Sequence, residues 1–429
     1  MAESTGLRVI EICAGAGGQA LGLESAGFEH ELAVELDTNA VSTLQHNRPA
    51  WKVAEGDVAD PAVWDPSAYE AGPERSPVDL LAGGVPCPPF TIAGKQLGAT
   101  DERDLFAWAV EQAVAIKPRA LLLENVRGLS MPRFAGYRQH VLDRLQEAGY
   151  MAEWRLLHAS DYGVPQLRPR FVLIAMQPED FTFFNWPEPS DQDPPSVGMT
   201  LYELMKERGW KRAGEWRDRA NTIAPTIVGG SKKHGGADLG PTRAKRAWQE
   251  MWVDAHGIAD YAPSSDSDIS ERGPKLTCEM VKHLQGWDNK EFSWEFKGRK
   301  TSKYRQIGNA FPPPVARALG RAIAAALLHE KYGTIPRQLD PKKAFDPIYR
   351  ALRATDDFMT AAQIGKEAQV ALEPHELEHQ ISLLSRDFHI EVKNDGSTPA
   401  YKLGKFKAFL GQGDHARHEH FLKNRAKIS

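Results

Sequence analysis

The sequence of 429 residues predicts an α/β fold built on a parallel sheet. Four runs of Val, Ile, Leu and Ala, each bounded by Gly, Pro or polar residues, are typical of buried strands: residues 8–13, 32–35, 78–82 and 120–124. Helical spacing lies between and after them, at residues 19–26, 38–47, 102–116 and 133–148. Because strands that alternate with helices form parallel sheets covered on both faces, this order predicts a sheet between two helical layers. Residues 171–176 add one further strand.

Three domains are expected. Residues 1–176, completed by residues 306–332 with their Ala/Leu-rich helix over 315–332, form the α/β domain. Residues 177–305 are rich in Pro, Gly, Trp and charge, which is typical of a loop-rich binding segment. Residues 334–429 form a separate module, in which three helical patterns precede two strand-like runs. That order predicts a winged-helix-like module.

Composition excludes several classes of protein. Hydrophobic residues make up 41% and charged residues 26%, the profile of a globular protein in solution. The sequence has neither an apolar run of about 20 residues, as a membrane helix needs, nor a signal peptide at its start. With only three cysteines, a disulfide framework is excluded and a reducing, cytoplasmic compartment is expected.

The net charge of −4 hides local excesses of positive charge. Between Trp210 and Trp248 there are nine Lys or Arg against three Asp or Glu. Residues 297–305 hold five basic residues and no acidic one, and residues 401–429 hold seven against two. A charge run alone usually marks a solvated face, but together these runs are compatible with nucleic acid as a partner at particular faces.

A glycine-rich turn closes the first strand and opens a helix, with the sequence Glu11-Ile-Cys-Ala-Gly-Ala-Gly-Gly18. Glycines there let the backbone approach a ligand at a helix N-terminus. Glu35, at the end of the second strand, is placed to accept hydrogen bonds from ribose hydroxyls. This pairing favours an adenosine-containing cofactor over a turn that only packs helix on strand, and it leaves NAD and S-adenosylmethionine equally open.

A second loop, Gly83-Gly-Val-Pro-Cys-Pro-Pro-Phe-Thr91, follows another strand end. Cys87 lies between prolines that cannot continue a strand or helix around it, which argues against the usual interpretation of a lone cysteine as a small buried hydrophobe. A thiol with a reference pKa of about 8.5 needs little activation to become a nucleophile. Cys87 is therefore a candidate nucleophile.

Three further segments carry candidate residues. Glu124-Asn-Val126 ends a strand, where a carboxyl of raised pKa can donate a proton; the alternative is a capping Asn beside a solvated Glu. Gln166-Leu-Arg-Pro-Arg170 puts Arg168 and Arg170 on one face of the chain entering a strand, unless they form surface ion pairs. Gln306-Ile-Gly-Asn-Ala-Phe-Pro-Pro-Pro314 leads into the long helix.

In this order and at these separations, the five segments resemble the blocks of the cytosine-C5 DNA methyltransferases, over roughly residues 7–176 and 276–330. The resemblance implies a Rossmann-like S-adenosylmethionine-dependent methyltransferase fold with a small target-recognition domain. It also decides the cofactor in favour of S-adenosylmethionine, and no metal is expected.

The resemblance implies a role for each catalytic candidate. The thiolate of Cys87 adds to C6 of the cytosine, and Glu124 engages N3 and the exocyclic amine. Arg170 contacts O2 of the base, and Arg168 supports that loop. C5 then accepts the methyl group, and loss of the C5 proton releases Cys87.

The same resemblance assigns the cofactor site. Backbone contacts are expected from the turn around Ala14, ribose binding from Glu35, adenine recognition from Asp57 and closure of the methionine end by Asn309. The full set expected to bind the cofactor is Ala14, Gly15, Gly17, Gly18, Glu35, Leu36, Asp57, Val58, Pro86, Asn309 and Ala310. Two positions depart from the family pattern, because Cys13 replaces an aromatic residue and Leu36 a bulkier one.

Double-stranded DNA is the expected substrate, with the target cytosine flipped out of the duplex. Residues 177–305 are expected to read one short sequence, with Arg217, Arg219, Lys232, Lys233, Arg243 and Lys245 as candidates for phosphate contact. For the C-terminal module, the basic tail favours DNA and the acids Glu373, Glu376 and Glu378 oppose it. DNA binding and dimerisation therefore both stay open, in a chain otherwise expected to act as a monomer on DNA.

The expected protein is a bacterial modification methyltransferase of the cytoplasm and nucleoid, with a restriction endonuclease as a candidate partner. Two alternatives remain. One is methylation of transfer RNA on the same framework, against which the long recognition segment counts. The other is a non-catalytic DNA-binding protein, against which the intact Cys87, Glu124, Arg168 and Arg170 count.

Overall fold

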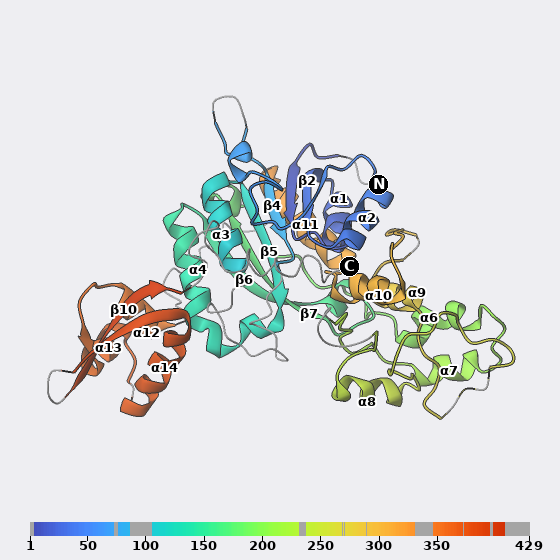
Figure 1. The fold of residues 1–429 in the computed structure, drawn as a ribbon. Helices are drawn as coiled ribbons and strands as arrows, with labels where there is room; N and C mark the ends of the chain where they lie inside the picture. The colour runs from blue at the N-terminus through green and yellow to red at the C-terminus, as the bar shows by residue number, and fades with distance from the viewer. Residues whose placement is uncertain are drawn as a thin grey trace.

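A seven-stranded sheet organises the first half of the chain, with the order β3-β2-β1-β4-β5-β7-β6 (Figure 1). The computed structural model describes residues 4–72, 76–85, 105–230, 237–267, 269, 271–288, 290–330, 346–371, 373–394 and 398–407. The strands are β1 (Arg8–Ile12), β2 (Glu29–Glu35), β3 (Val53–Glu55), β4 (Leu80–Gly83), β5 (Ala120–Val126), β6 (Met151–His158) and β7 (Pro169–Met176). The α/β fold class is thereby confirmed.

Parallel pairing joins five neighbouring strands, in the sheet order β3, β2, β1, β4 and β5, as the strand–helix alternation predicts. β7 runs antiparallel to both β5 and β6. The reason lies in the connection, because only a short segment links β6 to β7, whereas a parallel neighbour needs a crossover of a dozen or more residues. The reversal sets Val126 opposite Arg170.

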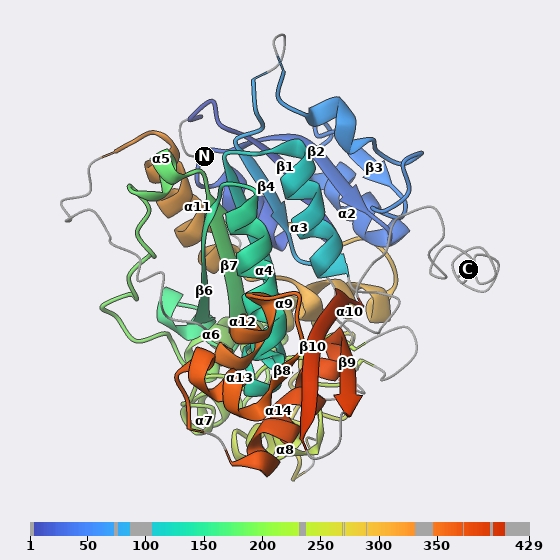
Figure 2. The same ribbon diagram turned by 90° about the vertical axis from the view of Figure 1, so that its left-hand side faces the viewer.

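Helices cover both faces of the sheet (Figures 1 and 2). α3 (Leu105–Ile116) and α4 (Ala135–Glu147) share one buried cluster with β1, β2, β4 and β5. α1 (Gly18–Glu24) and α11 (Pro313–Leu327) share another with the opposite face. α2 (Thr38–Asn47) is capped by Asp37, whose carboxylate accepts from the backbone N–H groups of Asn39 and Ala40. Helix α11, from a later part of the chain, thus packs on the same sheet as the first strand, β1.

The apolar patterns located the central strands and missed two at the sheet's edges. β3 has only three residues, partly or fully exposed, and so lacks an apolar run. β6 is mostly half-buried and carries Glu153 and Arg155 among its apolar residues. Edge strands need fewer apolar side chains than central ones, which is why composition alone did not reveal them.

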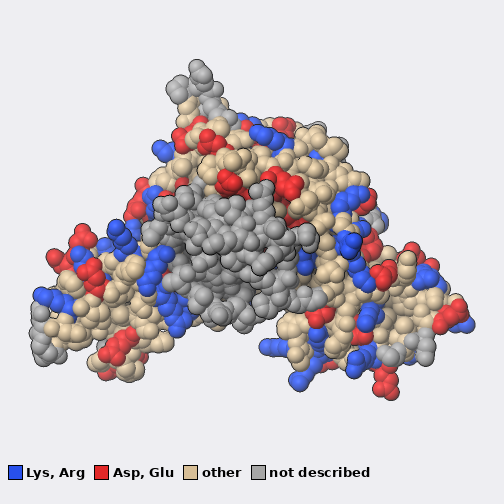
Figure 3. Space-filling view, viewed as in Figure 1, with Lys and Arg blue, Asp and Glu red and all other residues tan. Residues whose placement is uncertain are grey.

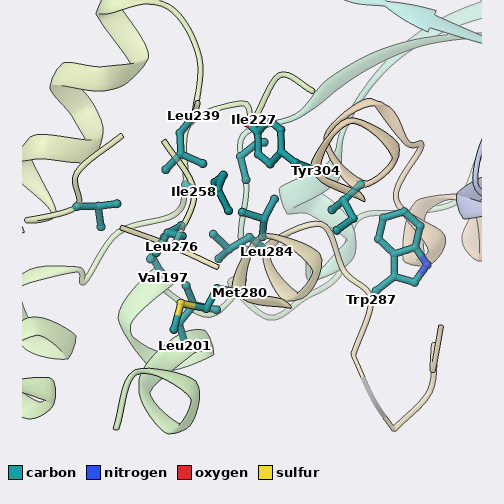
Figure 4. Packing of buried hydrophobic residues seen from close by; sticks show 14 of the residues in the cluster. Val197, Leu201, Ile227, Leu239, Ile258, Leu276, Met280, Leu284, Trp287 and Tyr304 are labelled. Atoms are coloured by element: carbon teal, nitrogen blue, oxygen red, sulfur yellow. The ribbon is translucent and has the colours of Figure 1, made fainter. Parts of the chain in front are cut away.

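The segment after the sheet folds around its own core. It contains α6 (Val197–Lys206), α7 (Ala213–Arg219), α8 (Thr242–Glu250), α9 (Cys278–Leu284) and α10 (Lys300–Asn309), together with long connections. Val197 and Leu201 of α6 lie beside Met280 and Leu284 of α9 (Figure 4). This cluster continues into the glycine-rich turn, where the indole N–H of Trp294 donates to the carbonyl of Ala16 at 2.8 Å. The short α5 (Pro178–Phe181) packs with α11 instead.

The C-terminal module has its own small core. Its elements are α12 (Pro347–Arg353), β8 (Met359–Thr360), α13 (Ala361–Ala368), α14 (Pro374–Asp387), β9 (Phe388–Asn394) and β10 (Pro399–Phe406), with the sheet order β8-β10-β9. The three helices and the hairpin are present as expected. Assignment to the winged-helix class stays a prediction.

Two further properties concern the whole described part of the chain. Cys13 and Cys278 carry free thiols. None of the helices in the described ranges is both long and apolar enough to cross a bilayer.

Candidate active site

A cavity of about 300 Å³ opens at the carboxyl ends of the parallel strands, where α/β sheets bind ligands. The glycine-rich turn, the ends of β2 and β5, the start of α3 and the end of α10 all contribute to its wall. Its lining includes these predicted residues: Ala14, Gly15, Gly18, Glu35, Leu36, Asp57, Val58, Glu124, Asn309 and Ala310. Segments from both ends of the α/β domain thus meet at one site.

The turn after β1 is held to the end of β2 through Glu35. The backbone N–H of Gly15 donates to Glu35 Oε2 at 2.7 Å, and the N–H of Asp37 donates to Oε1 at 2.7 Å. Gly15 and Gly17 have φ angles of 57° and 91°, which a side chain would strain. Burial raises the pKa of Glu35 above its ordinary value. Each carboxylate oxygen keeps a lone pair that can accept a further hydrogen bond.

Gly17 differs from the other predicted turn residues, because it is absent from the cavity lining. A Cβ atom built on it would lie 2.7 Å from the Trp294 ring. Because Gly17 has no side chain, the turn can pack against Trp294 of the segment 177–305.

Asp57 and Val58 form the wall beside Glu35. Asp57 is 4% exposed, and its Oδ1 accepts from the backbone N–H of Ala59 at 3.0 Å. The indole N–H of Trp64 donates to the carbonyl of Val58 at 2.6 Å and fixes the wall from behind. Leu36 is 50% exposed, a large apolar side chain available to a flat ligand at the cavity mouth.

Glu124 and Arg170 form a buried ion pair at the end of β5. Arg170 Nε lies 2.5 Å from Glu124 Oε1, and both side chains are at most a tenth exposed. The pKa of Glu124 is raised, because burial outweighs the attraction of Arg170 and Arg168. A carboxyl with a raised pKa keeps its proton to a higher pH than an ordinary glutamic acid does, and a protonated carboxyl can donate a proton to a bound base.

Arg168 joins three parts of the chain and is 1% exposed. Its guanidinium donates to the carbonyls of Ile227 at 2.7 Å and of Gly308 and Ala310 at 2.8 Å each. Burial lowers its pKa, and the positive charge of Arg170 adds to that effect. These contacts tie residue Ile227 and the end of α10 to the start of β7.

Cys87 and Pro86 lie outside the described residues. The chain leading to them is described up to Val85, whose carbonyl accepts from the side-chain amide of Asn125 at 3.4 Å. A Cβ atom built on Gly84 would lie 3.5 Å from Glu124 Oε2. The loop that carries the cysteine therefore begins next to the buried carboxyl.

Other residues at the cavity were missed by the sequence patterns. Gln19 is 3% exposed and lines the cavity, and both polar atoms of its amide lack a hydrogen-bond partner among the described residues. Arg305, Gln306 and Phe311 also line it. A polar side chain in the otherwise apolar first turn of α1 was the available signal for Gln19. In the described ranges, no group of three or more His, Cys, Asp and Glu is arranged to hold a metal ion.

The basic residues of the segment 177–305 that were predicted to contact phosphates differ in their surroundings. Lys245 pairs with Asp238 at 2.9 Å and Arg217 with Asp218 at 2.8 Å. Arg219 lies over the Trp252 ring at 4.8 Å, while Arg243 is exposed. Lys232 and Lys233 lie outside the described residues.

Comparison with known proteins shows which family the chain resembles. The sequence model of the C-5 cytosine-specific DNA methylases matches residues 7–325. The chain is 63% identical to the type II methyltransferase M.NaeI of Lentzea aerocolonigenes over 423 residues, 99% of each chain. It is 47% identical to the type II methyltransferase M.NgoMIV of Neisseria gonorrhoeae over 324 residues, 75% of this chain and 98% of the relative.

A solved structure of an E. coli prophage protein, described as a DNA modification methyltransferase, shares the fold with a TM-score of 0.50 at 22% identity. The match covers 76% of this chain and all of that one. The family model and the type II relatives favour DNA over transfer RNA as the substrate. The chain therefore belongs to the family of C-5 cytosine-specific DNA methylases and is a DNA cytosine-C5 methyltransferase.

Proposed function

We infer that this enzyme transfers the methyl group of S-adenosylmethionine to C5 of a cytosine turned out of a short, specific DNA sequence, with Cys87 as nucleophile. The observation that carries this proposal is the buried Glu124 carboxyl, held by Arg170 beside the cavity and next to the start of the Cys87 loop. Methylation at C5 needs an acid at N3 and a nucleophile at C6 of the same cytosine. The Glu124 carboxyl and the start of the loop that carries Cys87 lie side by side at this corner of the cavity.

The cavity fits the proposed methyl donor in size and chemistry. A volume of about 300 Å³ lies at the lower end of the range for ligand pockets. Glu35 would accept from the ribose hydroxyls, Asp57 from the adenine amine, and Asn309 would close the methionine end. The Gln19 amide has no hydrogen-bond partner among the described residues, which supports occupancy by a polar ligand, since an unsatisfied buried amide costs about 1–3 kcal/mol. When bound, the sulfonium supplies an electrophilic methyl group.

The protein's own residues prepare the base. The thiolate of Cys87 forms a bond to C6, and the electron pair of the C5–C6 double bond makes C5 nucleophilic. Protonated Glu124 donates to N3 and so neutralises the charge that develops there, while Arg170 contacts O2. After methyl transfer, C5 loses its proton to water. Cys87 then leaves C6 as the thiolate, which restores the C5–C6 double bond, and the N3 proton returns to Glu124.

Recognition of DNA is assigned to the segment that follows the sheet. Residues 177–305 are proposed as the target-recognition domain, flanked by the catalytic domain of residues 1–176 and 306–332. The exposed Arg243 is the described candidate for phosphate contact with the fewest competing partners, since Lys245 and Arg217 already face carboxylates. Residues 334–429 are proposed as a winged-helix-like module, which the described order of helices and strands supports.

The type II relatives support a bacterial setting for the enzyme. We place it in the cytoplasm at the nucleoid and expect a restriction endonuclease that cuts the same sequence. It is proposed to act as a monomer on its DNA.

Covalent trapping tests the proposed chemistry without knowledge of the target. Amplified DNA in which 5-fluorocytosine replaces cytosine is incubated with the enzyme and S-adenosylmethionine, because fluorine at C5 cannot leave as the proton does. The wild-type protein should form a complex that survives denaturing electrophoresis, and Cys87→Ala should not. A trapped complex with Cys87→Ala, or none with the wild type, would overturn the assignment of the nucleophile.

A further inference from the structure

The C-terminal module is fixed to the catalytic domain through α4. The Phe406 and His140 rings have centroids 4.2 Å apart, and Phe406 also packs against the catalytic core beside Tyr137. Arg353 pairs with Glu147 of the same helix. Arg133, just before α4, lies 3.4 Å from Asp387. Apolar and ionic contacts at several points therefore hold the module in one orientation.

The methyl-transfer reaction does not itself account for this module. The family model ends at residue 325, before the module begins. The relative M.NgoMIV is matched over 98% of its length by only 75% of this chain. A type II methyltransferase thus exists at three quarters of this length, so the attached module is expected to add a function to the common enzyme.

The described structure is an arch, with the sheet domain above and two lobes below (Figure 1). One lobe is the C-terminal module and the other is the recognition segment with α6, α7 and α8. Figure 3 shows Lys and Arg side chains gathered along the edge of the C-terminal lobe that faces the other lobe. The cavity with Glu124 lies in the domain that roofs this arch.

Four basic residues, called here the basic strip, lie on segments near the junction between the roof and the C-terminal lobe. Arg127 directly follows β5, Arg386 is in the last turn of α14, and Lys402 and Lys405 are on β10, whose Phe406 packs beside Tyr137 of α4. Arg127, Arg386 and Lys405 are exposed and Lys402 is half-buried, and none of the four forms an ion pair within the described part of the chain. Arg386 lies close enough to Arg133 to lower its pKa, which places it at the junction between module and roof.

Some acidic groups of the module are committed to other contacts, as Asp387 is to Arg133. Glu376 at the start of α14 is committed to a capping box, since its Oε2 accepts from the backbone N–H of Glu373 at 3.0 Å. In the described part of β9 and β10 the one acid is Glu391, opposite Lys402 in the strand register. The hairpin therefore keeps an excess of positive charge on its exposed side.

We propose that this strip of Arg127, Arg386, Lys402 and Lys405 binds the phosphate backbone of duplex DNA flanking the target site. The C-terminal module then acts as a second DNA-contacting lobe, opposite the recognition segment. This inference rests on the proposed function only in taking DNA as the substrate. Unpaired basic side chains at a rigid edge suit phosphates, which bind without sequence preference and strengthen the grip on any duplex long enough to reach them.

Binding to duplexes of two lengths tests the proposal. The probes are fluorescein-labelled random-sequence duplexes of about 12 and about 36 base pairs, roughly one and three helical turns. The variant is the full chain with Arg386→Gln, Lys402→Gln and Lys405→Gln, and the matched control is Lys366→Gln on α13, an exposed lysine of the same module outside the strip. Anisotropy titrations over a range of salt give the affinity and its salt slope.

The triple variant should bind the long duplex at least about tenfold more weakly, with a salt slope reduced by about 0.9 for each phosphate that the protein no longer neutralises. Its affinity for the short duplex and the behaviour of Lys366→Gln should match the wild type. Wild-type affinity and slope on the long duplex would overturn the proposal. Unchanged DNA affinity together with an altered sedimentation coefficient of the protein would also overturn it, because the strip would then mediate contact between copies of the chain. Trapping by Cys87 is measured in a separate experiment. A failed duplex-binding test would therefore leave the proposed chemistry intact, and a failed trapping test would leave the result of the duplex-binding test to stand by itself.

Discussion

Arg170 Nε and Glu124 Oε1 lie 2.5 Å apart at the end of the central strand pair, both nearly buried. The contact depends on the reversed direction of β7, which places Arg170 opposite Val126, two positions beyond Glu124. A parallel β7 would carry its first residues to the other end of the sheet. The antiparallel strand is therefore what brings the acid and the arginine together at the end of β5.

The first prediction concerns how methyl transfer depends on pH. Burial raises the pKa of Glu124, and an ordinary thiol titrates near 8.5. If one must be protonated and the other ionised, the rate is flat between these pKa values and falls above the upper one. In Glu124→Gln no proton is lost from this position, so the rate should rise about tenfold per pH unit up to the thiol pKa.

Single-turnover rates between pH 5 and 10 check this prediction. At pH 7 the variant should be slower by at least about a hundredfold, the lower range for general acid catalysis. A Glu124→Gln profile parallel to that of the wild type would show that Glu124 supplies no proton.

The second prediction concerns Arg168. Arg168→Met removes the donor to the carbonyls of Ile227, Gly308 and Ala310 and leaves the first two buried without that partner. At about 1–3 kcal/mol per buried unsatisfied group, the free energy of unfolding should fall by at least about 2 kcal/mol. Urea unfolding measures the loss. The matched change Arg144→Met, which removes a half-exposed ion pair with Glu111, should cost less than about 1 kcal/mol.

The sequence predicted the residues of this site better than it predicted their connections. Glu35 could be placed at the ligand-binding edge because parallel strands all end there, whereas Asp57 and Asn309 were expected only from the family resemblance. Arg168 and Arg170 could be placed on one face, but not next to Glu124, because nothing local in the sequence signals the direction of β7. Gln19, whose amide has no hydrogen-bond partner among the described residues, was missed because the sequence does not show that its side chain is buried beside the cavity.

The third prediction concerns the contact between α1 and α11. A Cβ atom on Gly22 would lie 2.4 Å from Ala316 Cβ and 2.6 Å from the Pro313 carbonyl. Gly22→Ala should therefore push the two helices apart and destabilise the protein by about 1–3 kcal/mol, as overpacking does. Gly214→Ala in α7 is the control, because no atom lies within 4 Å of its Cβ position and Ala favours a helix. Thermal unfolding midpoints should fall for the first variant and hold or rise for the second.

The fourth prediction concerns His140, at the junction of α4 and the C-terminal module. Burial, aided by the charges of Arg353 and Arg144, lowers its pKa to about 3. Its Nδ1 lies 3.0 Å from the Tyr349 hydroxyl, which Arg353 also contacts, and Asp143 and Glu147 complete the surrounding charges. The unfolded chain binds a proton below about 6.5 and the folded chain does not, so this contribution is full above pH 6.5 and is lost as pH falls.

Between pH 7 and pH 5 the loss should reach up to about 2 kcal/mol. Urea unfolding at the two pH values measures it, with His140→Leu as the comparison that lacks the titrating group. An equal fall in stability in both proteins would remove His140 as the source.

The central claim is cytosine-C5 methylation of DNA at one short sequence with Cys87 as nucleophile. Bisulfite sequencing of plasmid DNA from cells that express the protein tests it most directly, beside cells that express Cys87→Ala. We expect protected cytosines confined to one short sequence with the wild type and none with the variant. Unprotected cytosines throughout both samples, or the same protection in both, would contradict the account.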